Sequence, residues 1–155
     1  MGYGVVAETT SGLVALDFGA LTTTSDRPLA ERLRVLYEGL IALIARFHPT
    51  EVAVEELFFS RNVRTALAVG HARGVAMLAA ANCGLEVSEY SPQQVKQAVA
   101  VYGRARKEQV QQMVQVLLGL SELPEPDDAA DALALAICHL HTSQAEQLIN
   151  RSVLS

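Results

Sequence analysis

Two acidic residues follow directly after a predicted buried strand, a position where charged side chains are uncommon. Glu55 and Glu56 end the run Val52-Ala53-Val54, whose β-branched and small side chains predict a short, buried central strand. A buried carboxylate without a partner is costly, so these side chains either reach solvent at the end of the strand or one of them holds a metal ion. In an open α/β sheet, functional sites are built at the carboxyl ends of the strands.

Two further carboxylates, Asp128 and Asp131, lie three residues apart in a predicted helix and therefore share one helix face. The residues around them are small and apolar, which predicts packing near the sheet. Carboxylates so close together repel each other unless a cation neutralises them, and Mg²⁺ or Mn²⁺ binds such a pair together with water and phosphate oxygens. The alternative is helix capping, because acids in a first turn complement the helix dipole. We favour capping for Asp127.

Alternating strands and helices must position these acids. Hydrophobic periodicity and turn residues predict strands at 3–7, 12–21, 51–56 and 85–90, with the first two joined as a hairpin. Helices are predicted from 25–28 to just before Pro49, and at 65–82, 91–101, 107–118 and 128–141. In the fourth helix, Val110, Val114 and Leu117 are expected to face inward. This order predicts an α/β fold with a mixed sheet.

The composition is that of one globular domain. The chain has 155 residues, half of them hydrophobic, and a mean hydropathy of +0.23. No apolar run approaches the ~20 residues that a membrane helix needs, and the first residues lack the pattern of a signal peptide. Cys83 and Cys138 share no ligand-like spacing, so we interpret both as buried thiols of a reducing cytosol and predict a cytoplasmic protein.

Charge is unevenly distributed along the chain. The net charge of −5 taken alone argues against a nucleic-acid partner. Residues 61–107, however, hold seven basic residues and only two acidic ones, Glu86 and Glu89. Such segregation predicts a basic face suited to nucleic acid and a separate acidic region, although a solvated helix surface would explain it equally well.

Six short runs form a pattern that extends over nearly the whole chain. They are Gly2-Tyr3-Gly4-Val5-Val6, Val54-Glu55-Glu56-Leu57-Phe58, Gly70-His71-Ala72-Arg73-Gly74, Pro92-Gln93-Gln94-Val95-Lys96-Gln97, Lys107-Glu108-Gln109-Val110 and Asp128-Ala129-Ala130-Asp131-Ala132-Leu133-Ala134. Together they resemble the RuvC family of bacterial Holliday-junction resolvases. The resemblance implies a ribonuclease-H-like fold and a homodimer that cuts opposed strands of a four-way DNA junction using Mg²⁺. It also implies partnership with the branch-migration complex of RuvA and RuvB, a nuclease domain over 1–142 and a flexible tail over 143–155.

The resemblance assigns roles to the matching residues. Glu55, and not Glu56, matches the family's strand-end glutamate, while Asp128 and Asp131 match its two helix-borne acids. These three would hold two Mg²⁺ ions per active site, with Mn²⁺ as a substitute. Lys96 and Lys107 match functional lysines near the scissile phosphate and count with the acids as catalytic. Residues expected to contact DNA are Phe58, which matches an aromatic that stacks on an unpaired base, and the basic residues Arg61, Arg64, Arg73, Arg104 and Arg106.

The family pattern begins with a strand reading roughly Ile-Asp-Pro-Gly, placed just before Gly-Tyr-Gly-Val. This chain starts at Met1-Gly2-Tyr3, so we expect the first, central strand and its metal-bridging aspartate to be absent from it, and the true start to lie upstream. Asp17, in Leu16-Asp17-Phe18-Gly19, resembles the missing motif but follows the Gly-Tyr-Gly-Val run. We therefore predict Asp17 to be an exposed strand residue.

The four histidines are predicted to be structural. His139 and His141 are two residues apart and point to different helix faces, while His48 and His71 have no partner at ligand spacing.

Three functions remain open from the sequence. The first is a Mg²⁺-dependent, structure-selective endonuclease that acts on four-way junctions as a dimer. The second is a junction-binding dimer without catalysis, because the N-terminal aspartate is absent. The third is a ribonuclease-H-like fold recruited for protein interaction.

Overall fold

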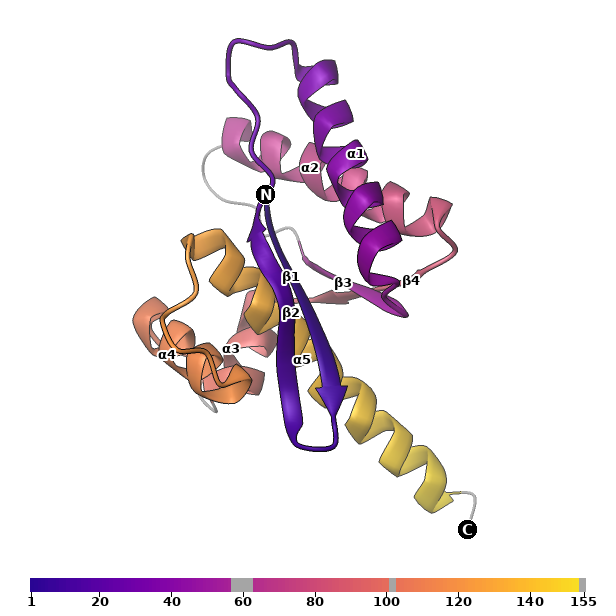
Figure 1. Cartoon of the computed structure of the whole chain (residues 1–155), viewed down its shortest axis with the longest axis vertical. Helices are drawn as coiled ribbons and strands as arrows, with labels where there is room; N and C mark the ends of the chain where they lie inside the picture. Colours follow the sequence, from indigo (N-terminus) through magenta and orange to yellow (C-terminus); the bar gives the residue numbers. More distant parts are fainter. Residues whose placement is uncertain (57–62, 101–102, 154–155) are drawn as a thin grey trace. The chain divides into compact units, whose positions relative to one another are not determined.

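The structure is a computed structural model that describes residues 1–56, 63–100 and 103–153 (Figure 1). The side chains of Arg64 and Val153 are outside this description. The chain divides into two compact units. One unit, here called the parallel-pair unit, comprises Met1 and Ala20–Ser91; the other, the hairpin unit, comprises Gly2–Gly19 and Pro92–Ser155.

The parallel-pair unit contains a strand–helix–strand arrangement. Strand β3 (Glu51–Glu55) pairs in parallel with β4 (Glu86–Tyr90), from Glu51 opposite Glu86 to Glu55 opposite Tyr90. Helix α2 (Val63–Asn82) makes the connection between them, as parallel strands require. The buried side chains of this unit are Leu36, Val54, Ala79, Ala80 and Tyr90.

Helix α1 (Leu29–Phe47) packs on α2, and its buried residue is Leu36. The Asn82 amide of α2 donates a 2.8 Å hydrogen bond to the Tyr37 hydroxyl of α1. The helix ends at His48, which takes the left-handed conformation (φ 46°) and donates its N–H to the carbonyl of Ile44. His48 therefore has a structural position, as predicted.

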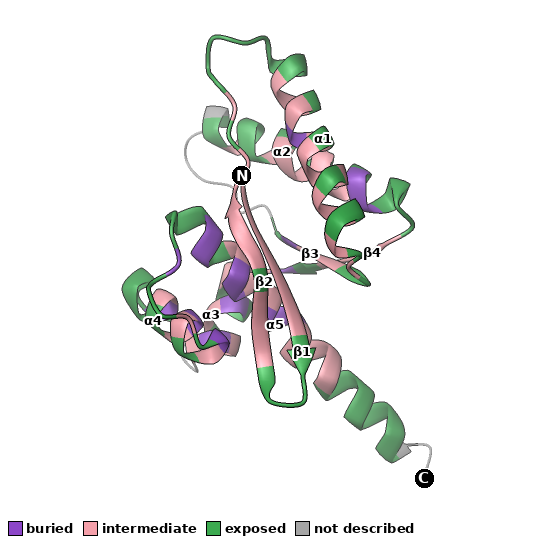
Figure 2. Cartoon of the chain, in the orientation of Figure 1, coloured by how far each residue is buried: buried purple, intermediate pink, exposed green. Residues whose placement is uncertain are grey.

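The hairpin unit is organised around the N-terminal half of α5 (Asp127–Val153). Strands β1 (Gly2–Thr9) and β2 (Gly12–Ala20) form the predicted hairpin, and β1 lies along α5 (Figure 1). Helices α3 (Pro92–Ala100) and α4 (Lys107–Leu118) pack on α5 and on each other. Figure 2 shows the buried residues gathered along the first half of α5, among them the fully buried Leu133, Ile137 and Cys138.

The fold class is mixed α/β, with short sheets flanked by helices. Within the described residues, the four strands form two separate two-stranded sheets, β1–β2 and β3–β4. The predicted α/β class is confirmed, although the sequence predicted one mixed sheet and the described strands lie in two short ones.

Several details differ from the sequence predictions. Helix α5 continues to Val153 instead of ending at His141, and its side chains are exposed from residue 145 to 152. Cys83 is exposed, not buried, because it follows the last residue of α2. In α4 the inward positions are Val110, Val114 and Leu118, while Leu117 is only half-buried. Across the described ranges, none of the helices is long and apolar enough to cross a membrane.

Candidate active site

The two acids of α5 are presented to solvent by a helix whose other face is anchored. Asp128 and Asp131 are exposed, whereas Ala129 and Ala130 between them are almost completely buried. The helix begins after Pro126, whose carbonyl accepts the N–H of Ala129 at 2.8 Å. Small buried residues hold this turn against the hairpin unit, so the acids project from a fixed backbone.

Two glycines of β1 bring that backbone close. Gly2 and Gly4 are two residues apart and so face the same side of the strand, toward α5. A Cβ atom at Gly2 would overlap the main-chain carbonyl of Asp128, and one at Gly4 would lie 2.8 Å from the Leu133 side chain. The Gly-Tyr-Gly run therefore allows β1 to lie directly on the turn that carries the acids.

Helix α4 supplies a cation to this turn. The Nζ atom of Lys107 lies 3.1 Å from Oδ2 of Asp127 and 3.5 Å from Oδ2 of Asp131. The hydrogen bond with Asp127, together with the charges of both carboxylates, raises the pKa of Lys107 above its usual value. Hydrogen bonds from Lys107 and then Gln111 lower the pKa of Asp127.

Asp127 lies in the first turn of α5, where the sequence predicted an acid that complements the helix dipole. Its carboxylate also reaches across to α4: Oδ1 accepts a 2.9 Å hydrogen bond from Nε2 of Gln111, and Oδ2 pairs with Lys107. A capping-type residue can therefore also pair with a neighbouring helix. The sequence does not show that α4 lies opposite.

The acids of α5 have the chemistry that a magnesium site requires. Mg²⁺ is commonly held by one or two carboxylates, with water and substrate phosphate completing its shell, and Asp128 and Asp131 supply two. The ammonium group of Lys107 beside Asp131 shows that this face attracts a cation. Within the described residues, His, Cys, Asp and Glu side chains do not gather in any group of three or more that could hold a metal ion.

Glu55 belongs to the parallel-pair unit and ends β3. It is exposed, as is Glu56, whose N–H donates to the carbonyl of Tyr90 and extends the pairing with β4. Nε of Arg73 donates a 3.0 Å hydrogen bond to the main-chain oxygen of Glu55, and the same guanidinium pairs with Glu89. Arg73 thus fixes the end of the strand on which Glu55 sits.

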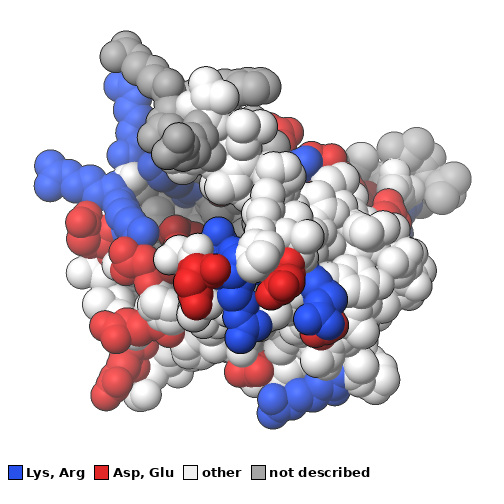
Figure 3. Space-filling model, turned by 90° about the horizontal axis from the view of Figure 1, so that it is seen from above, with Lys and Arg blue, Asp and Glu red and all other residues white. Residues whose placement is uncertain are grey.

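The other predicted DNA contacts occupy varied positions. Lys96 is half-buried on α3, whereas Arg104 and Arg106 are exposed just before α4. Phe58 and Arg61 lie outside the described residues, as does the side chain of Arg64. On the face seen in Figure 3, blue basic side chains of the described residues lie next to red acidic ones. The DNA-binding roles stay predictions.

Asp17 and the buried histidine are placed away from this chemistry. Asp17 lies in β2, is half-buried rather than exposed, and accepts a 3.4 Å hydrogen bond from the Tyr3 hydroxyl of β1. The prediction failed because the paired strand covers it. His139 is buried in α5, which fits its predicted structural role.

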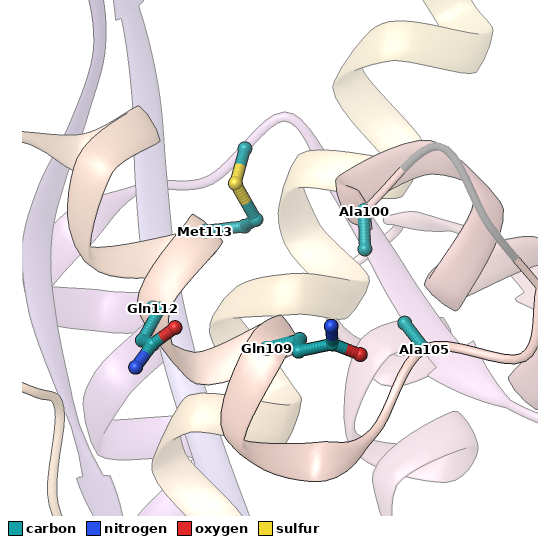
Figure 4. Close-up of a pocket in the computed structure, with 5 residues that line it drawn as sticks. All are labelled: Ala100, Ala105, Gln109, Gln112 and Met113. Carbon is teal, nitrogen blue, oxygen red and sulfur yellow. The ribbon is translucent and has the colours of Figure 1, made fainter.

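A small pocket of about 240 Å³ lies between α3 and α4 in the hairpin unit (Figure 4). Figure 4 shows the Gln109 side chain extending toward Ala105 of the preceding loop. The described residues that line the pocket carry no charge, so it is distinct from the acids of α5. They are Ala100, Ala105, Gln109, Gln112 and Met113.

The sequence of the chain matches a known family. The family model described as "Crossover junction endodeoxyribonuclease RuvC" matches residues 1–139. The chain belongs to the RuvC family. The RuvC resemblance of the sequence is therefore confirmed over almost its whole length.

Named relatives agree with the RuvC assignment. A "Crossover junction endodeoxyribonuclease RuvC" from Desulfitobacterium hafniense is 56% identical over 151 residues, which are 97% of this chain and 90% of the relative. A protein of the same name from Heliobacterium modesticaldum is 59% identical over 141 residues, covering 91% and 87% of the two chains.

Solved RuvC structures have the same fold. The RuvC structure from Thermus thermophilus is 39% identical, with a TM-score of 0.86, and the match covers 94% of this chain and 89% of that one. The T. thermophilus RuvC in complex with Holliday junction substrate is 40% identical with a TM-score of 0.88, covering 94% and 88%. The ribonuclease-H-like fold predicted for the chain is confirmed.

Three residues that lie beside the acids of α5 were not predicted from the sequence. Gly2 was noticed only as part of a run, and Asp127 and Gln111 were given no role in the site. A signal for the last two does exist: Lys107 and Gln111, like Asp127 and Asp131, are four residues apart and therefore neighbours on a helix surface.

Proposed function

We propose that this chain is a Holliday-junction resolvase, an endodeoxyribonuclease that makes paired nicks in four-way DNA junctions during recombination and repair. The observation that carries the proposal is the RuvC match over residues 1–139, a range that contains Glu55, Asp128 and Asp131. The relatives bear the name of an endodeoxyribonuclease, and nothing favours the alternative of a junction-binding protein without catalysis.

Metal dependence is a property of this nuclease family. We assign the metal as Mg²⁺, two ions per site, with Glu55, Asp128 and Asp131 as ligands and Mn²⁺ as a substitute. Such ions, when bound, activate the attacking water and stabilise the leaving oxygen. The exposure of all three carboxylates and the hard oxygen ligands that they supply support this assignment.

The chain's own cations would hold the DNA. Lys107 stands beside the acids of α5, and Arg104 and Arg106 are exposed immediately before the helix that carries it. Basic side chains so placed suit contacts to phosphates on either side of the bond that is cut. Lys96, Arg73, Arg61, Arg64 and the stacking residue Phe58 complete the proposed DNA-binding set.

We propose a homodimer that uses one face of α2. One side of this helix packs on α1, β3 and β4, while Val63, Leu67 and Leu78 remain exposed on the other. The spacing of these three residues places them on the same helix face as Gly74. No described heavy atom lies within 4 Å of a Cβ atom built at Gly74. An exposed apolar stripe of this kind suits contact with the same stripe on a second copy of the chain. Such a symmetric dimer fits an enzyme that cuts two opposed strands.

The dimer can be tested with one charged substitution. Leu67→Glu should convert the protein to a monomer in analytical ultracentrifugation at micromolar concentration. Val116→Glu is the matched control, because Val116 is also an exposed apolar residue but lies on α4. If Leu67→Glu remains dimeric, the α2 interface is wrong. Partnership with RuvA and RuvB and a cytoplasmic location remain predictions.

The function itself is tested with a labelled four-way junction assembled from synthetic strands. We expect symmetric nicks with Mg²⁺ or Mn²⁺, none with a chelator, and little cleavage of linear duplex. Binding should weaken steeply as salt is raised, because phosphate contacts release counterions. Junction binding without cleavage in either metal would contradict the enzyme assignment, and no salt-sensitive binding would contradict any junction-binding function.

A further inference from the structure

We propose that Asp127 is a positioning residue, which holds Lys107 against the acid-bearing turn of α5 so that its ammonium group is ready for the junction phosphate. The inference rests on the proposed function and adds a residue to it. In this arrangement Asp127 is neither a proposed metal ligand nor a proposed DNA contact.

The contacts form a closed set between two helices. Lys107 and Gln111 are one turn apart on α4, and Asp127 and Asp131 are one turn apart on α5. Asp127 uses both of its carboxylate oxygens, one for Gln111 at 2.9 Å and the other for Lys107 at 3.1 Å. The 3.5 Å contact of Lys107 with Asp131 is longer, so Asp127 is the nearer partner.

A lysine needs such a partner in order to act from a fixed place. Its charge sits at the end of four rotatable bonds, and the Lys107 side chain is 47% exposed. Asp131 cannot serve alone, because its carboxylate is a proposed metal ligand and its charge is then shared with a cation. Asp127 is outside the proposed ligand set, so its contact with Lys107 would not compete with metal binding.

The competing interpretation is that Asp127 only fastens α4 to α5. Gln111 separates the two ideas, because Gln111→Leu removes its bond to Asp127 and leaves the Lys107–Asp127 pair in place. A fastening role predicts that Gln111→Leu and Asp127→Ala have similar effects. A positioning role predicts that only Asp127→Ala slows cleavage.

The experiment is a double-mutant cycle on single-turnover cleavage of the four-way junction with Mg²⁺. Asp127→Ala should slow the chemical step roughly fivefold and change the junction Kd less than about twofold. In a Lys107→Met background, Asp127→Ala should cause no further loss. Glu122→Ala, which removes an exposed acid from the connection between α4 and α5, is the charge-matched control and should match the wild type.

A second measurement does not depend on activity. In metal-free protein, reductive methylation of Lys107, followed by mass spectrometry, should be several-fold faster in Asp127→Ala than in the wild type, with Gln111→Leu unchanged. Equal methylation rates, or an equal loss of cleavage in the Lys107→Met background, would overturn the inference. A wild type that fails to cleave would refute the proposed function, while the methylation result would still decide the role of Asp127.

Discussion

The acids at the end of β3 and at the start of α5 are held in different ways. Glu55 is placed through its main chain, because Arg73 binds the carbonyl of Glu55 and also pairs with Glu89 on the neighbouring strand. Asp128 and Asp131 are placed by close backbone packing, and Asp131 also has a cationic neighbour. A strand end has few side-chain neighbours of its own, whereas a helix turn can be both packed and paired.

This difference separates chemistry from support. Removing the charge of an acid should affect cleavage in both regions alike. Disturbing the supporting contacts should lower the stability of each unit in a different way. In the hairpin unit an added side chain would overlap the backbone of α5, and in the parallel-pair unit the hydrogen bonds of Arg73 would be lost.

The largest effect is expected from the acids themselves. Glu55→Gln and Asp131→Asn should each lower single-turnover junction cleavage by roughly 10³-fold or more, because each removes a charged oxygen ligand. Junction affinity in an electrophoretic assay should change little. A variant that kept a tenth of the wild-type rate would remove that residue from the proposed ligand set.

The packing of β1 on α5 should produce the next largest effect. Gly2→Ala should lower the free energy of unfolding by about 3 kcal/mol, measured with urea, because the added methyl group meets main chain that cannot rotate away. Gly74→Ala is the matched control, since the space around its Cβ is open within the described part of the chain. That change should stabilise the helix by up to about 1 kcal/mol. Equal effects would show that β1 does not need a glycine at position 2.

The support of Glu55 should be weaker. Arg73→Met should cost about 1–2 kcal/mol of stability, because the Arg73 side chain is only 21% exposed and makes two contacts. Arg34→Met provides the comparison. Arg34 pairs with Glu38 on α1, both side chains are well exposed, and the loss of this pair should cost only about 0.3–0.5 kcal/mol of stability. Unchanged stability would contradict this supporting role, whereas weaker junction binding would bear only on the separate proposal that Arg73 contacts DNA.

The smallest effect should be a pH dependence of the α4–α5 pair. Lys107 lowers the pKa of Asp127 below its ordinary value of 3.8, so the unfolded state binds the proton more tightly than the folded state. The contribution is present above that value and is lost as the pH falls through the lower, folded value. Carbon-detected NMR titration should show this lowered pKa of Asp127, and Lys107→Met should raise it toward the ordinary value, because the Gln111 hydrogen bond remains. A titration that is the same in both proteins would contradict the pairing.

Much of the fold followed from periodic patterns. The hairpin, the helix that ends before Pro49 and the strand before Glu55 were each predicted from the sequence, and each was confirmed. The end of α5 was not predicted, because residues 142–153 lose the apolar stripe although they contain neither proline nor glycine to stop the helix.

Contacts between elements were harder to predict from sequence. The burial of Asp17 depends on Tyr3 across the hairpin, and the role of Asp127 depends on the placement of α4. Such outcomes depend on which surfaces meet, and propensity or spacing within one element does not determine that.

The length of α5 has a practical consequence. Its 27 residues form one continuous helix of about 40 Å, with the acids on the first turns and exposed side chains on the last ones. A fluorophore or surface tether attached near residue 150 would therefore be far from the acids yet joined to them by a single rod. Single-molecule orientation measurements on junction DNA could use the axis of this helix to report the orientation of the acids Asp128 and Asp131.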